Sequence, residues 1–211
     1  MQPEIRLRRE GDRNMPVLVW RWPVAMRVIS SAPHGGGIGV RRWVINAQVP
    51  PSYARRDPDH HLAKLAVSLG LPGRGVGMLT AADVRSHVSG SDAGVEVIAT
   101  VGLSQPILAA VPEPVVARPA PVPAAGTINI VAFVPQRLSD AALVNAVGTA
   151  TEAKVQALVD AGLAATGTAT DAVCVLCPDE GQPADFGGPR SRWGARLARA
   201  VHAAVAAGAC R

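Results

Sequence analysis

Hydroxyl, amide and carboxylate side chains cluster at the beginnings of two predicted strands. The first cluster is the string GTIN at 126–129, and the second is TGTATD at 166–171. Strands joined by one helix in a β-α-β unit run parallel, so their beginnings meet at the same edge of the sheet. We therefore expect one polar site at this edge. Its members are Thr127, Asn129, Thr168, Thr170 and Asp171.

The predicted helix between these strands carries two further charged candidates. Ser139 is a suitable N-cap and Gly162 a suitable terminator, so we expect the helix over 139–161. On a helical wheel, Lys154 lies within about 50° of the centre of the apolar stripe, and Glu152 lies on its flank. The Lys154 ammonium either reaches water along that stripe or reaches the polar site. The stripe consists of Val144, Val147, Thr151, Val155 and Leu158.

A glycine-rich loop, HGGGIG at 34–39, follows an earlier predicted strand. The backbone N–H groups of Gly35, Gly36 and Gly37 can converge on an anion or on a developing oxyanion. The spacing matches neither the Walker pattern nor the dinucleotide fingerprint, so a tight turn is an equal alternative. His34, beside this loop, is the histidine best placed to transfer a proton or contact a ligand.

The three cysteines do not predict a metal or redox site. Cys174 and Cys177 form a C-x-x-C, but the surrounding string AVCVLCP is typical of a buried strand. Residues three apart on a strand point to opposite faces, so packed thiols are favoured over zinc or disulfide exchange. No local zinc motif such as H-E-x-x-H occurs, and we expect no metal or cofactor. Unpaired cysteines suit a reducing compartment, and we expect a cytoplasmic protein.

Composition favours a globular domain over other classes. The 211 residues are 48% hydrophobic and 18% charged, and no apolar run is long enough to predict a membrane span. The net charge of +5 invites a nucleic-acid interpretation. The arginines are scattered, however, and the seven aromatic residues are too few for a base-stacking surface. We therefore expect no nucleic-acid partner, and the sequence predicts no oligomeric state.

The element pattern predicts an α+β fold. We expect a single layered domain with a mixed β-sheet, antiparallel strands in its N-terminal part and a C-terminal β-α-β-α unit. A flexible N-terminal arm is predicted for 1–15, and 16–211 form the domain, with a proline-rich surface loop at 104–125. Strands are expected at 17–22, 25–31, 43–49, 76–81, 94–101, 127–134 and 169–177. Helices are expected at 60–69, 139–161 and 191–207.

Several strings, taken in order, resemble the adenosylcobinamide amidohydrolase family, the cobyric-acid-forming enzymes of corrinoid salvage. The likeness covers about 24–205, and its most specific parts are GTIN at 126–129, TEAK at 151–154 and TGTATD at 166–171. It also includes SSA at 30–32, GGG at 35–37, VIN at 44–46 and GMLTAA at 77–82.

The resemblance implies hydrolysis of one secondary amide in adenosylcobinamide, the bond between the propionyl arm of the corrin ring and 1-amino-2-propanol. The products are adenosylcobyric acid and aminopropanol. Adenosylcobinamide, with its cobalt, is then the substrate rather than a cofactor.

Amide hydrolysis needs an activated nucleophile, a stabilised oxyanion and a proton for the leaving amine. Our hypothesis is that Asp171 or Glu152 activates water, and that Lys154 sets the protonation state or protonates the amine. Asn129 or the backbone at 35–37 would hold the oxyanion. The expected substrate-binding residues are His34, Gly35, Gly36, Gly37, Asn46, Asn129, Thr168 and Thr170.

Two alternatives remain open. Thr127 could be the nucleophile after self-cleavage behind Gly126, which would free an N-terminal amine to act as the base. The chain could instead be a non-catalytic module that binds a corrinoid or a nucleotide through the same glycine loop and threonines.

Overall fold

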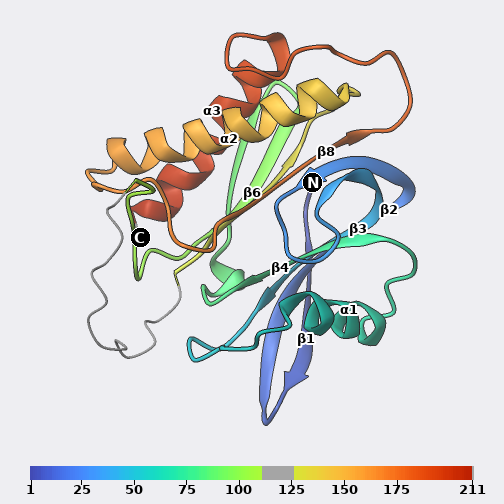
Figure 1. Ribbon diagram of the computed structural model, residues 1–211, viewed down its shortest axis with the longest axis vertical. Coiled ribbons are helices and arrows are strands. Elements are labelled where there is room, and N and C mark those ends of the chain that lie inside the picture. The colour runs from blue at the N-terminus through green and yellow to red at the C-terminus, as the bar shows by residue number, and fades with distance from the viewer. Residues whose placement is uncertain (111–125, 211) are drawn as a thin grey trace.

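The computed structural model describes residues 1–110 and 126–210, and eight strands of this described part form one open, mixed sheet (Figure 1). The strands are β1 (Glu4–Glu10), β2 (Arg13–Ser30), β3 (Gly37–Gln48), β4 (Gly75–Thr80), β5 (Val88–Asp92), β6 (Val95–Val101), β7 (Ile128–Phe133) and β8 (Ala172–Pro178). The helices are α1 (Pro58–Ser68), α2 (Asp140–Asp160) and α3 (Arg192–Ala209), with a 3₁₀ turn at Val84–Ser86. No helix in the described ranges is long and apolar enough to cross a membrane.

The sheet has the order β4-β3-β2-β8-β7-β6-β5, and β1 pairs with β2 beside this path. The pairs β3–β4 and β7–β8 are parallel, and the other pairs are antiparallel. The α+β fold and the parallel unit around α2 are therefore confirmed, and so are the antiparallel N-terminal strands, except that β3 and β4 pair parallel. We predicted two strands on either side of Pro23, but β2 is one long strand. Its register with β3 shifts between Arg21 and Met26, around the proline that cannot donate to the ladder.

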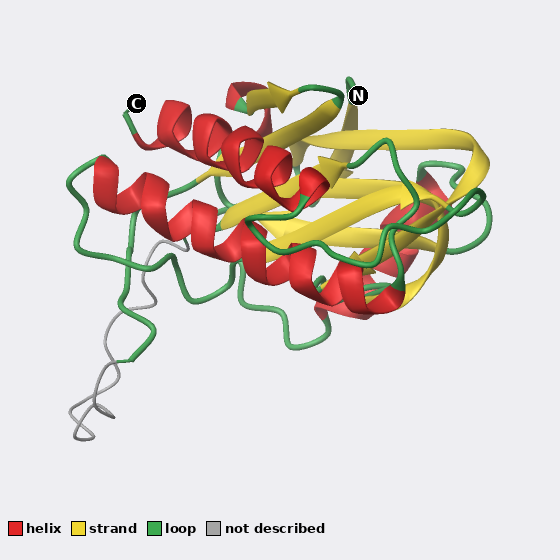
Figure 2. Cartoon of the chain, turned by 90° about the horizontal axis from the view of Figure 1, so that it is seen from above, coloured by secondary structure: helices red, strands yellow, loops and turns green. Residues whose placement is uncertain are grey.

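The two halves of the sheet face each other over a shared core. Buried residues of β2, β3 and β4 form one hydrophobic cluster with residues of β6, β7 and β8, including Met78, Val131 and Cys174. Helices α2 and α3 lie side by side and cover the outer face of β5–β8, as Figures 1 and 2 show. Helix α1 covers the opposite outer face, formed by β2 and β3. Strand ends from both halves meet between them, at the residues that follow β2 and β3, the end of β4 and the beginnings of β7 and β8.

Most of residues 1–15 lie in the sheet, as β1 and the start of β2, rather than in the flexible arm that we predicted. Strand β1 pairs with β2 from Glu4–Val19 to Glu10–Arg13. The charged residues of this segment suggested a solvated arm, but Arg8 is buried and its Nη2 donates to the Gln48 carbonyl at 2.8 Å. Most of the predicted proline-rich loop at 104–125 lies outside the described residues.

Helix α2 presents a different face to the core from the one we predicted. Val144 is 57% exposed, whereas the buried face consists mainly of alanines together with Leu143 and Leu158. Small side chains let the helix pack closely against the sheet and α3, so the alanines rather than the valines determine its rotation. The same rotation turns Lys154 inward.

The two cysteines of β8 are buried on opposite sides of the sheet, as the strand alternation predicts. Cys177 packs in the cluster under α2 and α3, and Cys174 packs in the cluster between the two halves. Burial raises the pKa of the Cys174 thiol to about 12, so this thiol stays protonated and unreactive.

Candidate active site

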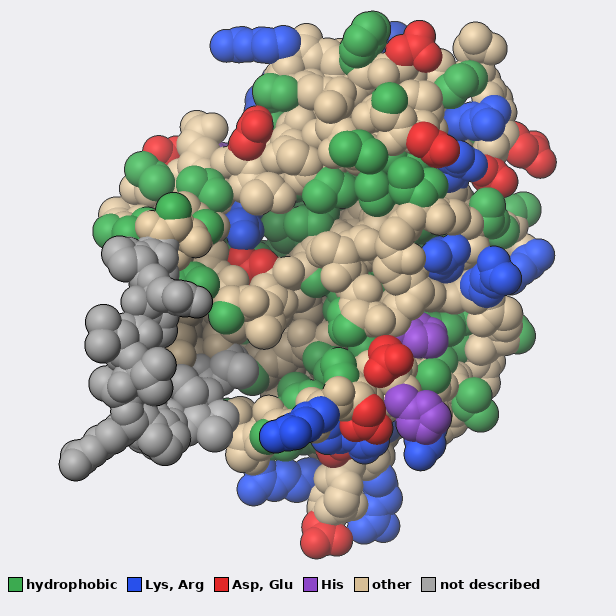
Figure 3. Space-filling model, viewed as in Figure 1, with side chains coloured by type: hydrophobic (Ala, Val, Ile, Leu, Met, Phe, Trp, Pro, Cys, Tyr) green, Lys and Arg blue, Asp and Glu red, His purple; other side chains and the backbone are tan. Residues whose placement is uncertain are grey.

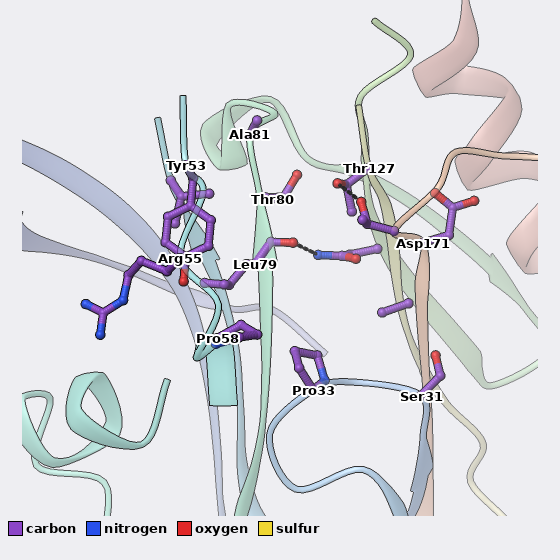
Figure 4. A pocket seen from close by; sticks show the side chains of 14 residues that line it. Ser31, Pro33, Tyr53, Arg55, Pro58, Leu79, Thr80, Ala81, Thr127 and Asp171 are labelled. Atoms are coloured by element: carbon purple, nitrogen blue, oxygen red, sulfur yellow. Dashed lines mark hydrogen bonds between the residues drawn. The ribbon is translucent and has the colours of Figure 1, made fainter. Parts of the chain in front are cut away.

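A pocket of about 460 Å³ opens where strand ends from both halves of the sheet meet. The beginnings of β7 and β8 form one wall, with Thr127 and Asp171 (Figure 4). The opposite wall consists of the end of β4 and of the segment between β3 and α1, which contributes Tyr53 and Arg55. Ser31 and Pro33, which follow β2, lie at the base of the view.

The polar wall is built around a buried ion pair between Lys154 and Asp171. The Lys154 ammonium donates to Asp171 Oδ2 at 2.5 Å, and the side chains are only 8% and 11% exposed. Of the two interpretations of Lys154, the structure shows the second, in which it leaves the helix surface and reaches the polar site. Asp171 therefore lies in the pocket wall, and Lys154 lies directly behind it.

Three further donors complete the coordination of Asp171. Its Oδ1 accepts from the Ile128 backbone N–H at 2.9 Å and from the Thr168 hydroxyl at 2.5 Å. Its Oδ2 also accepts from the Thr168 backbone N–H at 3.1 Å. Each carboxylate oxygen thus has two donors, which matches its two lone pairs. The bond to Ile128 also joins the beginnings of β7 and β8, so the predicted meeting of the two polar clusters is confirmed.

Gly167 makes room for this ion pair. Its φ of +152° is unfavourable for residues with a side chain. A Cβ at this position would lie 2.2 Å from Asp171 Oδ2 and 2.5 Å from Lys154 Nζ. The glycine in TGTATD is therefore a steric requirement of the buried pair.

A pair of threonine hydroxyls lies beside the carboxylate. Thr127 Oγ1 and Thr170 Oγ1 are 2.8 Å apart, and the Thr170 hydroxyl is 3.4 Å from the Gly126 carbonyl (Figure 4). The single hydroxyl hydrogen of Thr170 has two acceptors within reach. When Thr170 donates to the Gly126 carbonyl, Thr127 donates to Thr170; when Thr170 donates to Thr127, the Thr127 hydroxyl hydrogen is available to a ligand. Both residues line the pocket.

Asn129 has a different role from the one expected for an oxyanion donor. Its side-chain nitrogen donates to Asn46 Oδ1 and to the Leu79 carbonyl, both at 2.8 Å. Asn46 in turn donates to Thr100 Oγ1 at 2.9 Å. Both amide hydrogens of Asn129 are thereby used in joining β7 to β3 and β4, and none remains for an oxyanion. Asn46 is buried behind Asn129 and belongs to this support.

The glycine loop does not line this pocket and forms a packed turn. A Cβ on Gly35 would lie 1.9 Å from the Gly75 carbonyl, and the Gly35 and Gly37 φ values are +69° and +78°. The Arg41 guanidinium donates to the Gly35 carbonyl at 2.9 and 3.0 Å and reaches the Gly36 carbonyl at 3.4 Å. His34 stacks on Trp43 with their ring centroids 5.8 Å apart.

Glu152 is also separate from the pocket. It is exposed on α2, two residues from Lys154 and therefore about 200° around the helix from it. Thus the structure brings together Thr127, Asn129, Thr168, Thr170, Asp171 and Lys154, and leaves Glu152, His34 and the loop at 35–37 outside.

Sequence reasoning missed the wall formed by Tyr53, Arg55 and Thr80. Tyr53 is the single tyrosine of the chain, which is the one signal that could have drawn attention to it. Burial raises the pKa of its phenol, so the hydroxyl keeps its proton at neutral pH. Arg55 pairs with Asp57 at 2.8 Å and lowers the pKa of that carboxyl to about 2.

Within residues 1–110 and 126–210, no group of three or more His, Cys, Asp or Glu side chains is arranged to hold a metal ion. The groups available in the pocket are therefore hydroxyls, a phenol, a guanidinium and a buried lysine–carboxylate pair. Such groups can bind a neutral amide and donate hydrogen bonds to its carbonyl oxygen.

Comparison with known proteins identifies related chains. The family model described as CbiZ, adenosylcobinamide amidohydrolase, matches residues 2–211. An adenosylcobinamide amidohydrolase of Methanosarcina mazei is 31% identical over 189 residues, which cover 85% of this chain and 88% of the relative. A protein of the same name from Halobacterium salinarum is 40% identical over 120 residues, which cover 54% of this chain and 49% of that relative.

Proposed function

Because the chain belongs to the adenosylcobinamide amidohydrolase family, we propose that it hydrolyses the amide between the corrin propionyl arm and 1-amino-2-propanol in adenosylcobinamide. The products are adenosylcobyric acid and aminopropanol. We further propose that the reaction takes place in the pocket between the two halves of the sheet.

The observation that supports this location of the reaction is the buried Lys154–Asp171 pair in the pocket wall, beside the hydroxyls of Thr127 and Thr170, which line the pocket. A pocket of about 460 Å³ is too small for a corrin ring with its adenosyl group. It is large enough for the propionyl-aminopropanol arm. The ring therefore lies at the mouth, and only the scissile amide and its flanking groups enter.

In this arrangement, the Thr127 hydroxyl donates to the carbonyl oxygen as that oxygen becomes negative. Lys154, which lies behind Asp171, neutralises the charge of that carboxylate, so the wall does not repel the developing oxyanion. Asp171 holds Lys154 and the two strand beginnings in place. Because all four of its lone-pair positions are occupied, Asp171 acts by positioning and does not accept a proton from water.

A substitution that fills the pocket tests this location. Ala81 lines the pocket and is partly exposed, so Ala81→Trp is expected to block the amide arm and abolish turnover. Ala25 is equally partly exposed but lines a different hollow, next to Pro178, so Ala25→Trp is the matched control. Conversion of adenosylcobinamide is followed by liquid chromatography and mass spectrometry, and folding by circular dichroism.

We expect wild type and Ala25→Trp to release cobyric acid and aminopropanol, and folded Ala81→Trp to release neither. Full turnover by Ala81→Trp would show that the reaction takes place elsewhere. No conversion by any of the three proteins would contradict the proposed activity.

A further inference from the structure

Tyr53, His61 and Glu10 form a hydrogen-bonded chain that leads away from the pocket. The Tyr53 hydroxyl is 2.9 Å from His61 Nδ1, and His61 Nε2 is 3.1 Å from Glu10 Oε2. The phenol and imidazole rings stack with centroids 5.5 Å apart. The three residues come from the segment after β3, from α1 and from β1, so the fold and not the local sequence assembles them.

The direction of each hydrogen bond follows from the acceptor at the far end. The Glu10 carboxylate has no hydrogen to donate, so His61 Nε2 carries the proton and donates it. Nδ1 is then the unprotonated nitrogen, and the Tyr53 hydroxyl donates to it. This is the hydroxyl–imidazole–carboxylate order that activates a hydroxyl in nucleophilic hydrolases.

The surroundings of His61, the central residue of this hydrogen-bonded chain, keep its imidazole neutral and fix its orientation. His61 is buried, and burial lowers the pKa of its imidazole. Glu10 is ion-paired with Arg8, which is itself held by the Gln48 carbonyl. The charged and titratable groups around His61 are Arg8, Arg9 and Glu10 from β1, Tyr53 and Arg55 from the segment after β3, and Lys64 on α1.

The chain connects two hollows of the molecule. Tyr53 lines the pocket on the side opposite Thr127 and Asp171 (Figure 4). His61, Glu10 and Arg8 line a shallow outer hollow together with Lys64. Charged side chains gather on this part of the surface, over α1 and the hairpin of β1 and β2 (Figure 3).

We propose that Tyr53 is a catalytic residue and that His61 and Glu10 form a proton relay behind it, an inference that rests on the proposed amide hydrolysis. His61 accepts and returns the proton of Tyr53, and Glu10 orients His61. The polar wall offers hydrogen-bond donors and a cation but no unoccupied base, since Asp171 is fully engaged. The relay on the opposite wall supplies that missing group.

The relay accounts for every proton of the reaction. As the water oxygen bonds to the amide carbon, Tyr53 Oη takes a proton from the water and passes its own proton to His61 Nδ1. The carbonyl oxygen becomes the oxyanion, and Glu10 stabilises the imidazolium. In the second step His61 returns its proton to Tyr53, and Tyr53 donates a proton to the amide nitrogen. The C–N bond then breaks, which gives the carboxylic acid and the free amine, and these exchange a proton to become carboxylate and ammonium.

Kinetics of conservative variants test the relay. Tyr53→Phe keeps the ring stacking and removes only the hydroxyl, so we expect kcat to fall about a hundredfold with KM nearly unchanged. Glu10→Gln is expected to lower kcat and to move the acid limb of the pH profile to lower pH, because the Glu10 carboxylate raises the pKa of His61. The wild-type limb itself is expected below the ordinary histidine pKa of about 6.5, since only neutral His61 can accept a proton. His60→Gln, an exposed neighbour on the same helix, is the control and should match wild type.

A second readout does not depend on turnover. Nitrogen-15 NMR of the histidines at pH 8 should show His61 protonated at Nε2 and unprotonated at Nδ1, and Tyr53→Phe should shift the Nδ1 signal. Full kcat in folded Tyr53→Phe, or a His61 protonated at Nδ1, would overturn the relay. If wild type shows no turnover but His61 has the expected tautomer, the proposed function fails, and the relay as a catalytic device fails with it. Turnover by wild type together with a wrong tautomer overturns the relay alone.

Discussion

Lys154→Met is expected to lower the free energy of unfolding by about 3 kcal/mol, the lower end of the range for removing one partner of a buried ion pair. The substitution leaves the Asp171 carboxylate buried, with its three other donors still in place. Asp171→Asn should be more damaging, because it leaves the Lys154 ammonium buried without a carboxylate and because either orientation of the amide places its nitrogen against a backbone N–H, that of Thr168 or that of Ile128, which cannot accept a hydrogen bond. Urea denaturation followed by circular dichroism measures both.

An exposed acidic residue provides the matched control for this pair. Asp160 on α2 is 53% exposed and contacts His202 at 2.8 Å, so Asp160→Asn should change stability by less than about 1 kcal/mol. In Asp171→Asn protein that is still folded, we also expect turnover to fall at least about a hundredfold, because Lys154 and the hydroxyl pair lose their fixed positions. Stability and turnover like those of Asp160→Asn would contradict the role of the pair.

Thr127→Val is expected to lower kcat by about 10²–10³-fold, the effect of removing one donor to an oxyanion. Valine has nearly the shape of threonine, and the lost hydroxyl bond to Thr170 is worth only about 1 kcal/mol of stability. Thr127→Ser keeps the hydroxyl and should retain most of the activity. Steady-state kinetics with adenosylcobinamide measures each variant.

The control for Thr127 is Thr149→Val on α2. Thr149 is 2% exposed and donates to the Gly187 carbonyl at 2.9 Å, and neither residue lines the pocket, so the loss of this hydroxyl should leave kcat unchanged. Equal kcat values for Thr127→Val and Thr149→Val would exclude Thr127 as a donor. The self-cleavage alternative is tested separately by the intact mass of active protein, since a chain of 21.7 kDa carries no free amine at Thr127.

The polar wall was predictable because its signals are local. Ser139 caps α2 as expected, with its hydroxyl accepting from the Ala142 N–H at 3.1 Å. Once the helix and the two flanking strands are recognised, the right-handed β-α-β connection brings the strand beginnings together, and with them the string GTIN and Asp171. Both strands lie largely within the apolar runs predicted at 127–134 and 169–177, and nearly all of their residues are buried.

The opposite wall could not be predicted, since tertiary contacts assemble it. Glu10 and His61 are 51 positions apart and meet only because β1 pairs with β2 beside α1. The glycine loop illustrates a different difficulty. Close backbone approach and positive φ require glycine at Gly35 just as an anion-binding loop does, and the sequence looks the same in both cases.

Hydrolysis in water labelled with oxygen-18 tests the central claim most directly. Purified protein is incubated with adenosylcobinamide in labelled water, and the corrinoid and amine products are identified by mass spectrometry. We expect adenosylcobyric acid with one oxygen-18 atom in its new carboxylate, and an equal amount of unlabelled 1-amino-2-propanol. A corrinoid that remains unchanged, or one that is cleaved without taking up the label, would contradict the assignment of this chain as an amide hydrolase.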